Sequence, residues 1–143
     1  MANEDFIIKQ LSVFLENKPG SLARIVKVMD DAKVNVLALS LAEAGDFGVI
    51  RMLVKNPDDA RKKLHEKRFT VSLTNVLGIR IRDGPGLYEI ARILGDSSVN
   101  IEYAYACTST IGPMLILRVS DIEKAIVKIV EVGGGLVEKK YLE

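Results

Sequence analysis

The segment with the clearest potential for binding chemistry is Asn17-Lys18-Pro19-Gly20-Ser21-Leu22. Apolar residues follow it at helical spacing, at Leu22, Ile25 and Met29. A helix that begins directly after a Pro-Gly turn leaves its first backbone N–H groups unpaired, and these favour an anion such as a carboxylate. Glycine lets a ligand approach the backbone closely, and Asn17 offers both a donor and an acceptor. The segment therefore predicts a site for a small zwitterion.

A similar but shorter segment, Asp83-Gly84-Pro85-Gly86-Leu87, lies in the second half of the chain. Asp83 stands here in place of Asn17, so a carboxylate replaces the side-chain amide, and the loop is one residue shorter. A carboxylate at this position would repel a ligand carboxylate, although it can hold an ammonium group. The first segment is therefore the better candidate for the site, with Asp83 and Gly84 as its weaker counterparts.

Residues that could catalyse a reaction are scarce. The single histidine, His65, lies in a charged helical stretch, and the single cysteine, Cys107, has no histidine near it in the sequence. No Ser/His/Asp set and no metal-ligand spacing recur, and the second loop lacks the lysine and spacing of a P-loop. Arg82 is the only hint of a phosphate-binding arginine loop. We expect no enzyme activity, no metal and no cofactor.

The composition excludes several classes of partner. The 143 residues carry 20 basic and 19 acidic side chains, a net charge of +1, whereas nucleic-acid-binding domains usually show a strong basic excess. No apolar run approaches the ~20 residues of a membrane helix, and the acidic start of the chain is unlike a secretory signal. The basic run at 61–68 fits a solvated helix face better than a phosphate site. We expect a cytoplasmic protein that binds neither nucleic acid nor membrane.

The chain repeats itself. Leu11, Val13 and Leu15 match Leu77, Ile79 and Ile81 at an offset of 66, which becomes 65 after the Pro-Gly pair. The shared Pro-Gly and the matching Val-Asn pairs at 34–35 and 99–100 make chance an unlikely source of this pattern. The repeat predicts two domains, residues 6–72 and 73–141.

Each repeat has the same predicted order of elements. In the first repeat we expect strands at 11–15, 34–42, 47–54 and 69–73, a helix at 22–29 and a second helix from Asn56 to Leu64. In the second repeat, Ser120 and Glu123 form the pattern of a capping box. The order β-α-β-β-α-β predicts an α+β fold of two ferredoxin-like βαββαβ units, with antiparallel sheets and helices on one face.

The first strand is apolar on both faces. Phe6, Ile8 and Phe14 alternate with Leu11, Val13 and Leu15, so a helix layer would cover only one of the two sets. The second repeat, or a second chain, is the natural cover for the other face.

Asn17-Lys18-Pro19-Gly20-Ser21-Leu22, followed by Val34-Asn35-Val36, resembles the ACT domain. Asp83-Gly84-Pro85-Gly86-Leu87 with Val99-Asn100-Ile101 resembles it again. The resemblance implies a regulatory module that binds a free amino acid between paired copies and controls an associated metabolic enzyme or regulator. It also implies a homo-oligomer, such as a dimer, and places Asn17 and Asn35 at ligand-contacting positions. Because the contributions come from opposite copies, Asn17 pairs with Asn100, and Asp83 with Asn35.

Other interpretations remain open for these residues. Asn17 is also suited to capping the helix or satisfying a turn, and Asn35 and Asn100 to ending a turn before a strand. Tyr103 and Tyr105 lie on one face of a strand and fit an interface better than a pocket. The alternative function is a dimerising scaffold that docks on an enzyme or regulator without binding a ligand.

Overall fold

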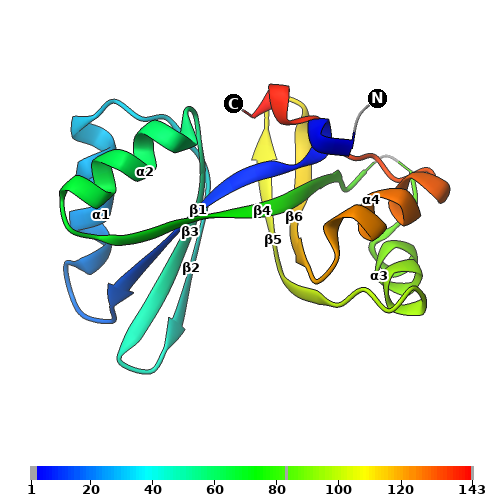
Figure 1. The fold of residues 1–143 in the computed structure, drawn as a ribbon, viewed down its shortest axis with the longest axis horizontal. Helices are drawn as coiled ribbons and strands as arrows, with labels where there is room; N and C mark the ends of the chain where they lie inside the picture. Colours follow the sequence, from blue (N-terminus) through cyan, green and yellow to red (C-terminus); the bar gives the residue numbers. More distant parts are fainter. Residues whose placement is uncertain (1–2, 83, 143) are drawn as a thin grey trace. The chain divides into compact units, whose positions relative to one another are not determined.

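A computed structural model of the chain describes residues 3–82 and 84–142. Their contacts divide the chain into two compact units. The first unit is Lys9–Thr74 together with Leu142, and the second is Asn75–Tyr141 together with the N-terminal residues 3–8. In each unit two helices pack on a β-sheet (Figure 1).

The first unit forms a sheet with the strand order β2-β3-β1-β4. Its elements are β1 (Ile8–Glu16), α1 (Ser21–Asp31), β2 (Val36–Ala44), β3 (Phe47–Val54), α2 (Pro57–Glu66) and the start of β4 (Thr70–Arg80). β3 pairs antiparallel with both β1 and β2, and Leu11 lies opposite Met52 in the register. This is the order expected of a βαββαβ unit, so the predicted fold is confirmed here.

In the second unit, the end of β4 pairs with β6, and β6 pairs with β5, both antiparallel. The elements are α3 (Leu87–Asp96), β5 (Ile101–Ser109), β6 (Gly112–Val119), α4 (Ile122–Glu131) and two short 3-10 helices, Asn3–Phe6 and Lys139–Tyr141. The last strand is reduced to a single bridge between Leu136 and Ile79. The Val137 N–H donates a hydrogen bond of 2.8 Å to the Gly78 carbonyl, which extends this pairing.

The core of the first unit lies between one sheet face and the helices. Leu11, Val13 and Leu15 on β1 pack against Ile25 and Met29 of α1, and all five side chains are buried. Burying one such side chain completely contributes roughly 1.5–3 kcal/mol. This packing fixes the position of the helix start, and therefore of the loop that precedes it.

Two details of the sequence prediction are wrong. The N-cap of α4 is Asp121, whose carboxylate accepts a hydrogen bond of 3.1 Å from the Lys124 N–H, so the capping box of Ser120 and Glu123 does not form. Asp121 has the extended backbone that an N-cap requires. Phe6 lies in a 3-10 helix rather than in the first strand. Asn56 is the N-cap of α2, but its side chain makes no capping bond.

Candidate functional site

The loop before α1 ends in an uncapped helix start. Gly20 is the N-cap residue, has φ +88° and provides no side chain to cap the helix. The Ser21 N–H donates to the Lys18 carbonyl at 3.3 Å, and the Arg24 N–H donates to the Gly20 carbonyl at 3.1 Å. Among the described residues, the N–H groups of Leu22 and Ala23 meet no acceptor. Two backbone donors are therefore available to a ligand.

A pocket of about 250 Å³, which we call the loop pocket, lies beside this helix start. One water occupies about 30 Å³ of the liquid, so the loop pocket has room for a small ligand. The predicted site residues that line it are Asn17, Lys18, Ser21 and Leu22. Strands β1, β2 and β3 supply the rest: Leu15, Glu16, Leu41, Ala42, Glu43 and Gly48.

The loop pocket carries charges of both signs. Lys18 Nζ lies 3.2 Å from Glu16 Oε2. Glu43 Oε2 accepts a hydrogen bond of 3.1 Å from the Gly45 N–H, which fixes its carboxylate at the turn between β2 and β3. Ser21 lies at the back, only 7% exposed. A cation and bare amides beside two carboxylates match the charge distribution of a zwitterion.

Asn17 connects the loop to the turn between β2 and β3. Its Nδ2 donates to the Gly45 carbonyl at 2.9 Å, and its backbone N–H donates to the Asp46 carbonyl at 2.8 Å. The interpretation that Asn17 satisfies a turn therefore has direct support, whereas the side chain does not cap α1. Contact between Asn17 and a ligand stays a prediction.

Asn35 lies at the far end of the same unit. It comes directly before β2, while Gly45 follows β2, and nine residues of strand span roughly 30 Å. Its carbonyl accepts a hydrogen bond of 3.1 Å from the Lys55 N–H. The first unit therefore does not bring Asn35 to Asn17. Asn100 has the corresponding place before β5, where its N–H donates to Ser120 Oγ at 2.9 Å.

The second loop differs from the first in shape. Asp83 lies outside the described residues. Gly84 has φ +83°, and Gly86 has an extended backbone with φ −72° and ψ 174°. The pocket that Pro85 and Leu87 line has a volume of about 30 Å³, room for about one water. A Cβ on Gly84 would lie 2.8 Å from the Gly133 carbonyl oxygen, so the backbones are already in close contact there.

Residues 6–143 match the protein family described as the ACT domain pair. The chain belongs to this family. The resemblance predicted from the two Pro-Gly segments is thus confirmed.

Two solved structures are similar to this ACT domain pair over most of its length. Protein BT0572 from Bacteroides thetaiotaomicron is 33% identical, with a TM-score of 0.87 and 97% of each chain covered. The ligand-free regulatory subunit of aspartate kinase from Thermus thermophilus has a TM-score of 0.60 at 15% identity, over 90% of this chain and 94% of that chain. The latter similarity supports the fold alone. A search of curated proteins finds no match.

The part of the loop pocket that the strands contribute was not predicted from the sequence. Leu41 and Glu43 of β2 and Gly48 of β3 were not predicted as site residues. The signal that could have found them is the predicted hairpin over 34–54. If this hairpin pairs antiparallel with the first strand, its turn must lie beside the loop that follows that strand.

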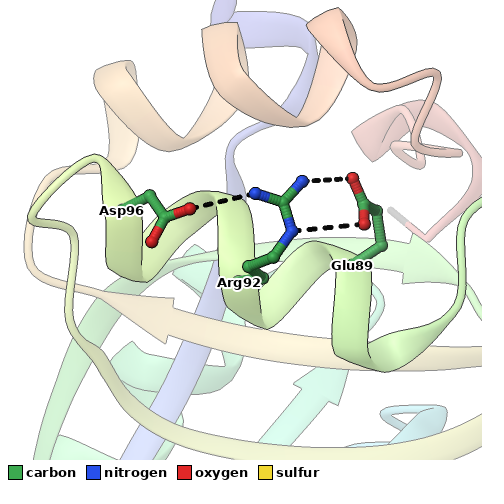
Figure 2. Close-up of polar contacts among 3 residues, drawn as sticks. All are labelled: Glu89, Arg92 and Asp96. Atoms are coloured by element: carbon green, nitrogen blue, oxygen red, sulfur yellow. Dashed lines mark hydrogen bonds and ion pairs between the residues drawn. The ribbon is translucent and has the colours of Figure 1, made fainter.

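An ionic cluster of three residues lies on α3, outside the loop pocket. Arg92 contacts Glu89 through two nitrogens and Asp96 Oδ2 at 2.9 Å (Figure 2). The hydrogen bonds from Arg92, and its charge, lower the pKa of Glu89, and the same contacts raise the pKa of Arg92. These residues are three and four positions apart, so they stabilise the helix locally.

In residues 3–82 and 84–142, no group of three or more His, Cys, Asp or Glu side chains is arranged to hold a metal ion. Within the same ranges, no helix has the length and apolar character needed to cross a membrane.

Proposed function

We propose that this ACT domain pair is a regulatory protein that binds a free amino acid in the loop pocket and thereby senses the level of a metabolite. The observation that carries the proposal is the uncapped start of α1, where the Leu22 and Ala23 amides lie beside a pocket of about 250 Å³. Membership of a family of regulatory domains supports it.

The charges suggest how the amino acid binds. Its carboxylate accepts hydrogen bonds from the Leu22 and Ala23 amides, beside the positive charge of Lys18. Its ammonium group lies toward Glu43, and its side chain lies against Leu15 and Leu41. For a ligand of about ten heavy atoms, a binding free energy near −5 to −8 kcal/mol is expected, or a Kd of roughly micromolar to a few hundred micromolar.

We further propose that the chain works as a homo-oligomer on a separate metabolic enzyme or regulator and has no catalytic activity of its own. Two similar solved structures are described as regulatory subunits of aspartate kinase, from Thermus thermophilus and Thermus flavus. These names motivate the proposal of an associated enzyme, while the particular enzyme is left open.

The test is thermal unfolding in the presence of each of the twenty amino acids. A true ligand at a hundred times its Kd stabilises the folded state by about 2.7 kcal/mol. The variant Ser21→Val, which replaces a hydroxyl with two methyl groups in the lining of the loop pocket, should lose this response. Ser72→Ala, at an exposed position of β4 outside the pocket, should keep it.

The second candidate function is a scaffold that self-associates without a ligand. It is favoured by β2, an edge strand on which Leu39 and Leu41 are 42% and 49% exposed. An edge strand of this kind is a template for pairing with another chain. If none of the twenty amino acids raises the melting temperature while the protein is dimeric, the scaffold is the better explanation.

A further inference from the structure

We propose that the first unit contains a second binding site, which takes a small ligand with a carboxylate or phosphate on a planar apolar ring. The site is a cleft of about 270 Å³ at the end of the sheet where β1 ends and β4 begins; we call it the arginine cleft. It goes beyond the amino-acid site proposed above. The residues that carry the argument are Phe14, Phe47, Phe69, Arg24 and Arg68.

Stacked aromatic rings form one part of the arginine cleft. The ring centroids of Phe14 and Phe47 lie 4.9 Å apart, and the ring planes are inclined by 26°. Despite this contact, the two residues remain 46% and 44% exposed. A third planar ring can bury the remaining aromatic surface, and such contacts contribute beyond simple area burial.

Two arginines, Arg24 and Arg68, form a second part of the arginine cleft. The Arg24 guanidinium, from α1, lies over the Phe69 ring with Cζ 5.4 Å from the centroid. Arg68 comes directly before Phe69, in the short connection between α2 and β4. Arg24 and Arg68 make no ion pair with any residue in the described ranges.

The acidic group in the cleft does not neutralise these arginines. Glu16 also lines the arginine cleft, but its carboxylate pairs with Lys18 at 3.2 Å. Two guanidinium groups that form no ion pair within the described ranges favour an anion, and the planar guanidinium fork matches the oxygens of a carboxylate or phosphate. A cleft with both aromatic rings and cations should therefore bind a ring-bearing anion more tightly than a free anion or an uncharged ring.

The arginine cleft is distinct from the loop pocket, although the two share a wall formed by Leu15, Glu16 and Ser21. Arg24 and Arg68 line the cleft but not the loop pocket, and Lys18 and Glu43 line the loop pocket but not the cleft. Each site can therefore be altered without changing the charged residues of the other.

The experiment is an NMR titration of the full chain that follows the backbone amides of Phe69 and Thr70. Phenyl phosphate and phenylacetate are the probes, and they distinguish a phosphate ligand from a carboxylate ligand. Two controls separate the groups: inorganic phosphate carries the anion without the ring, and benzyl alcohol carries the ring without the anion. We expect saturable chemical-shift changes with at least one ring-bearing anion. Inorganic phosphate and benzyl alcohol should each bind at least tenfold more weakly.

Variants then test the two cations. Arg24→Gln and Arg68→Gln should each weaken binding about tenfold or more, because each removes a charge-assisted hydrogen bond. Arg61→Gln, an exposed α2 arginine outside the arginine cleft, should leave binding unchanged. The proposal is overturned if neither ring-bearing anion shifts these amides, if inorganic phosphate binds equally well, or if both arginine variants bind normally.

The test of the arginine cleft is independent of the test of the proposed amino-acid site, because different backbone amides report on the two sites. Failure of the arginine cleft leaves the response of the Leu22 and Ala23 amides to an amino acid intact. Failure of the amino-acid site removes that response but leaves the Phe69 and Thr70 shifts.

Discussion

The side-chain amide of Asn17 donates a hydrogen bond of 2.9 Å to the carbonyl oxygen of Gly45. Two segments 28 positions apart in the sequence, the loop before α1 and the turn between β2 and β3, are joined by this bond. The loop contributes Lys18 to the loop pocket, and β2 contributes Glu43 just before the turn. Asn17 therefore shapes the pocket whether or not it contacts the ligand.

We predict that Asn17→Ala weakens amino-acid binding more than tenfold. The change removes the side-chain bond to the Gly45 carbonyl, while the backbone bond from the Asn17 N–H to the Asp46 carbonyl is kept. At the predicted ligand contact it also removes a hydrogen bond to a charged group, which amounts to ~1.5–3 kcal/mol. Isothermal titration calorimetry measures the effect. Asn3→Ala, at an exposed position of the other unit, is the control. Unchanged affinity in Asn17→Ala would remove this residue from the site.

A second prediction concerns two glycines with open space around them. Gly20 has φ +88°, so Gly20→Ala should destabilise the fold by about 1–2 kcal/mol through backbone strain. Gly95 lies within α3, where alanine is the better helix former, so Gly95→Ala should stabilise by roughly 0.5–1 kcal/mol. Urea unfolding of both variants checks these opposite signs; equal effects would refute the argument from φ.

The Cys107 thiol should react slowly. Burial raises the pKa of Cys107, because desolvation disfavours the thiolate, and the thiolate is the reactive form. At neutral pH, the folded chain should react with a disulfide reagent more slowly than free cysteine does, and the rate should recover in urea. Since the pKa is raised, the associated stability is complete below the ordinary thiol pKa and is lost as pH rises through the folded value. Equal rates for the folded and unfolded chains would contradict this prediction.

The Glu89–Arg92 contact predicts a measurable titration. Hydrogen bonding from Arg92 lowers the pKa of Glu89, so the contact stabilises α3 above the ordinary glutamate pKa and is lost as pH falls through the lowered value. Side-chain NMR should show this low pKa in the native chain and a rise in Arg92→Gln. The effect on global stability should be small, because these side chains are exposed to solvent. A Glu89 titration that is identical in the two chains would disprove the coupling.

Local patterns in the sequence predicted the fold because each pattern has a local physical cause. Alternation of Leu11, Val13 and Leu15 reflects a strand with one buried face, and Gly20 has the backbone freedom that the positive φ at the start of α1 requires. The N-cap of α4 was harder to predict, because Ser120 and Asp121 are both suitable N-cap residues. In the fold, Asp121 caps the helix, and the Ser120 hydroxyl accepts a hydrogen bond from the Asn100 N–H, 20 positions away.

The candidate site was predicted only on its loop side. Residues 17–22 are contiguous, so their chemistry can be read from the sequence directly. Glu43 and Gly48 reach the loop pocket through the register of β1, β2 and β3, in which Glu43 and Leu15 both lie opposite Gly48. That register depends on side-chain packing across three strands, which no short segment encodes.

The contrast between a pocket of about 250 Å³ at the first loop and one of about 30 Å³ at the second has a consequence for dose response. If the amino acid binds beside the first loop and not beside the second, each chain should take up one molecule and binding should saturate along a simple hyperbola. A sigmoidal curve would then require two or more chains acting together, so the steepness of the response would be set by assembly rather than by the duplication within the chain.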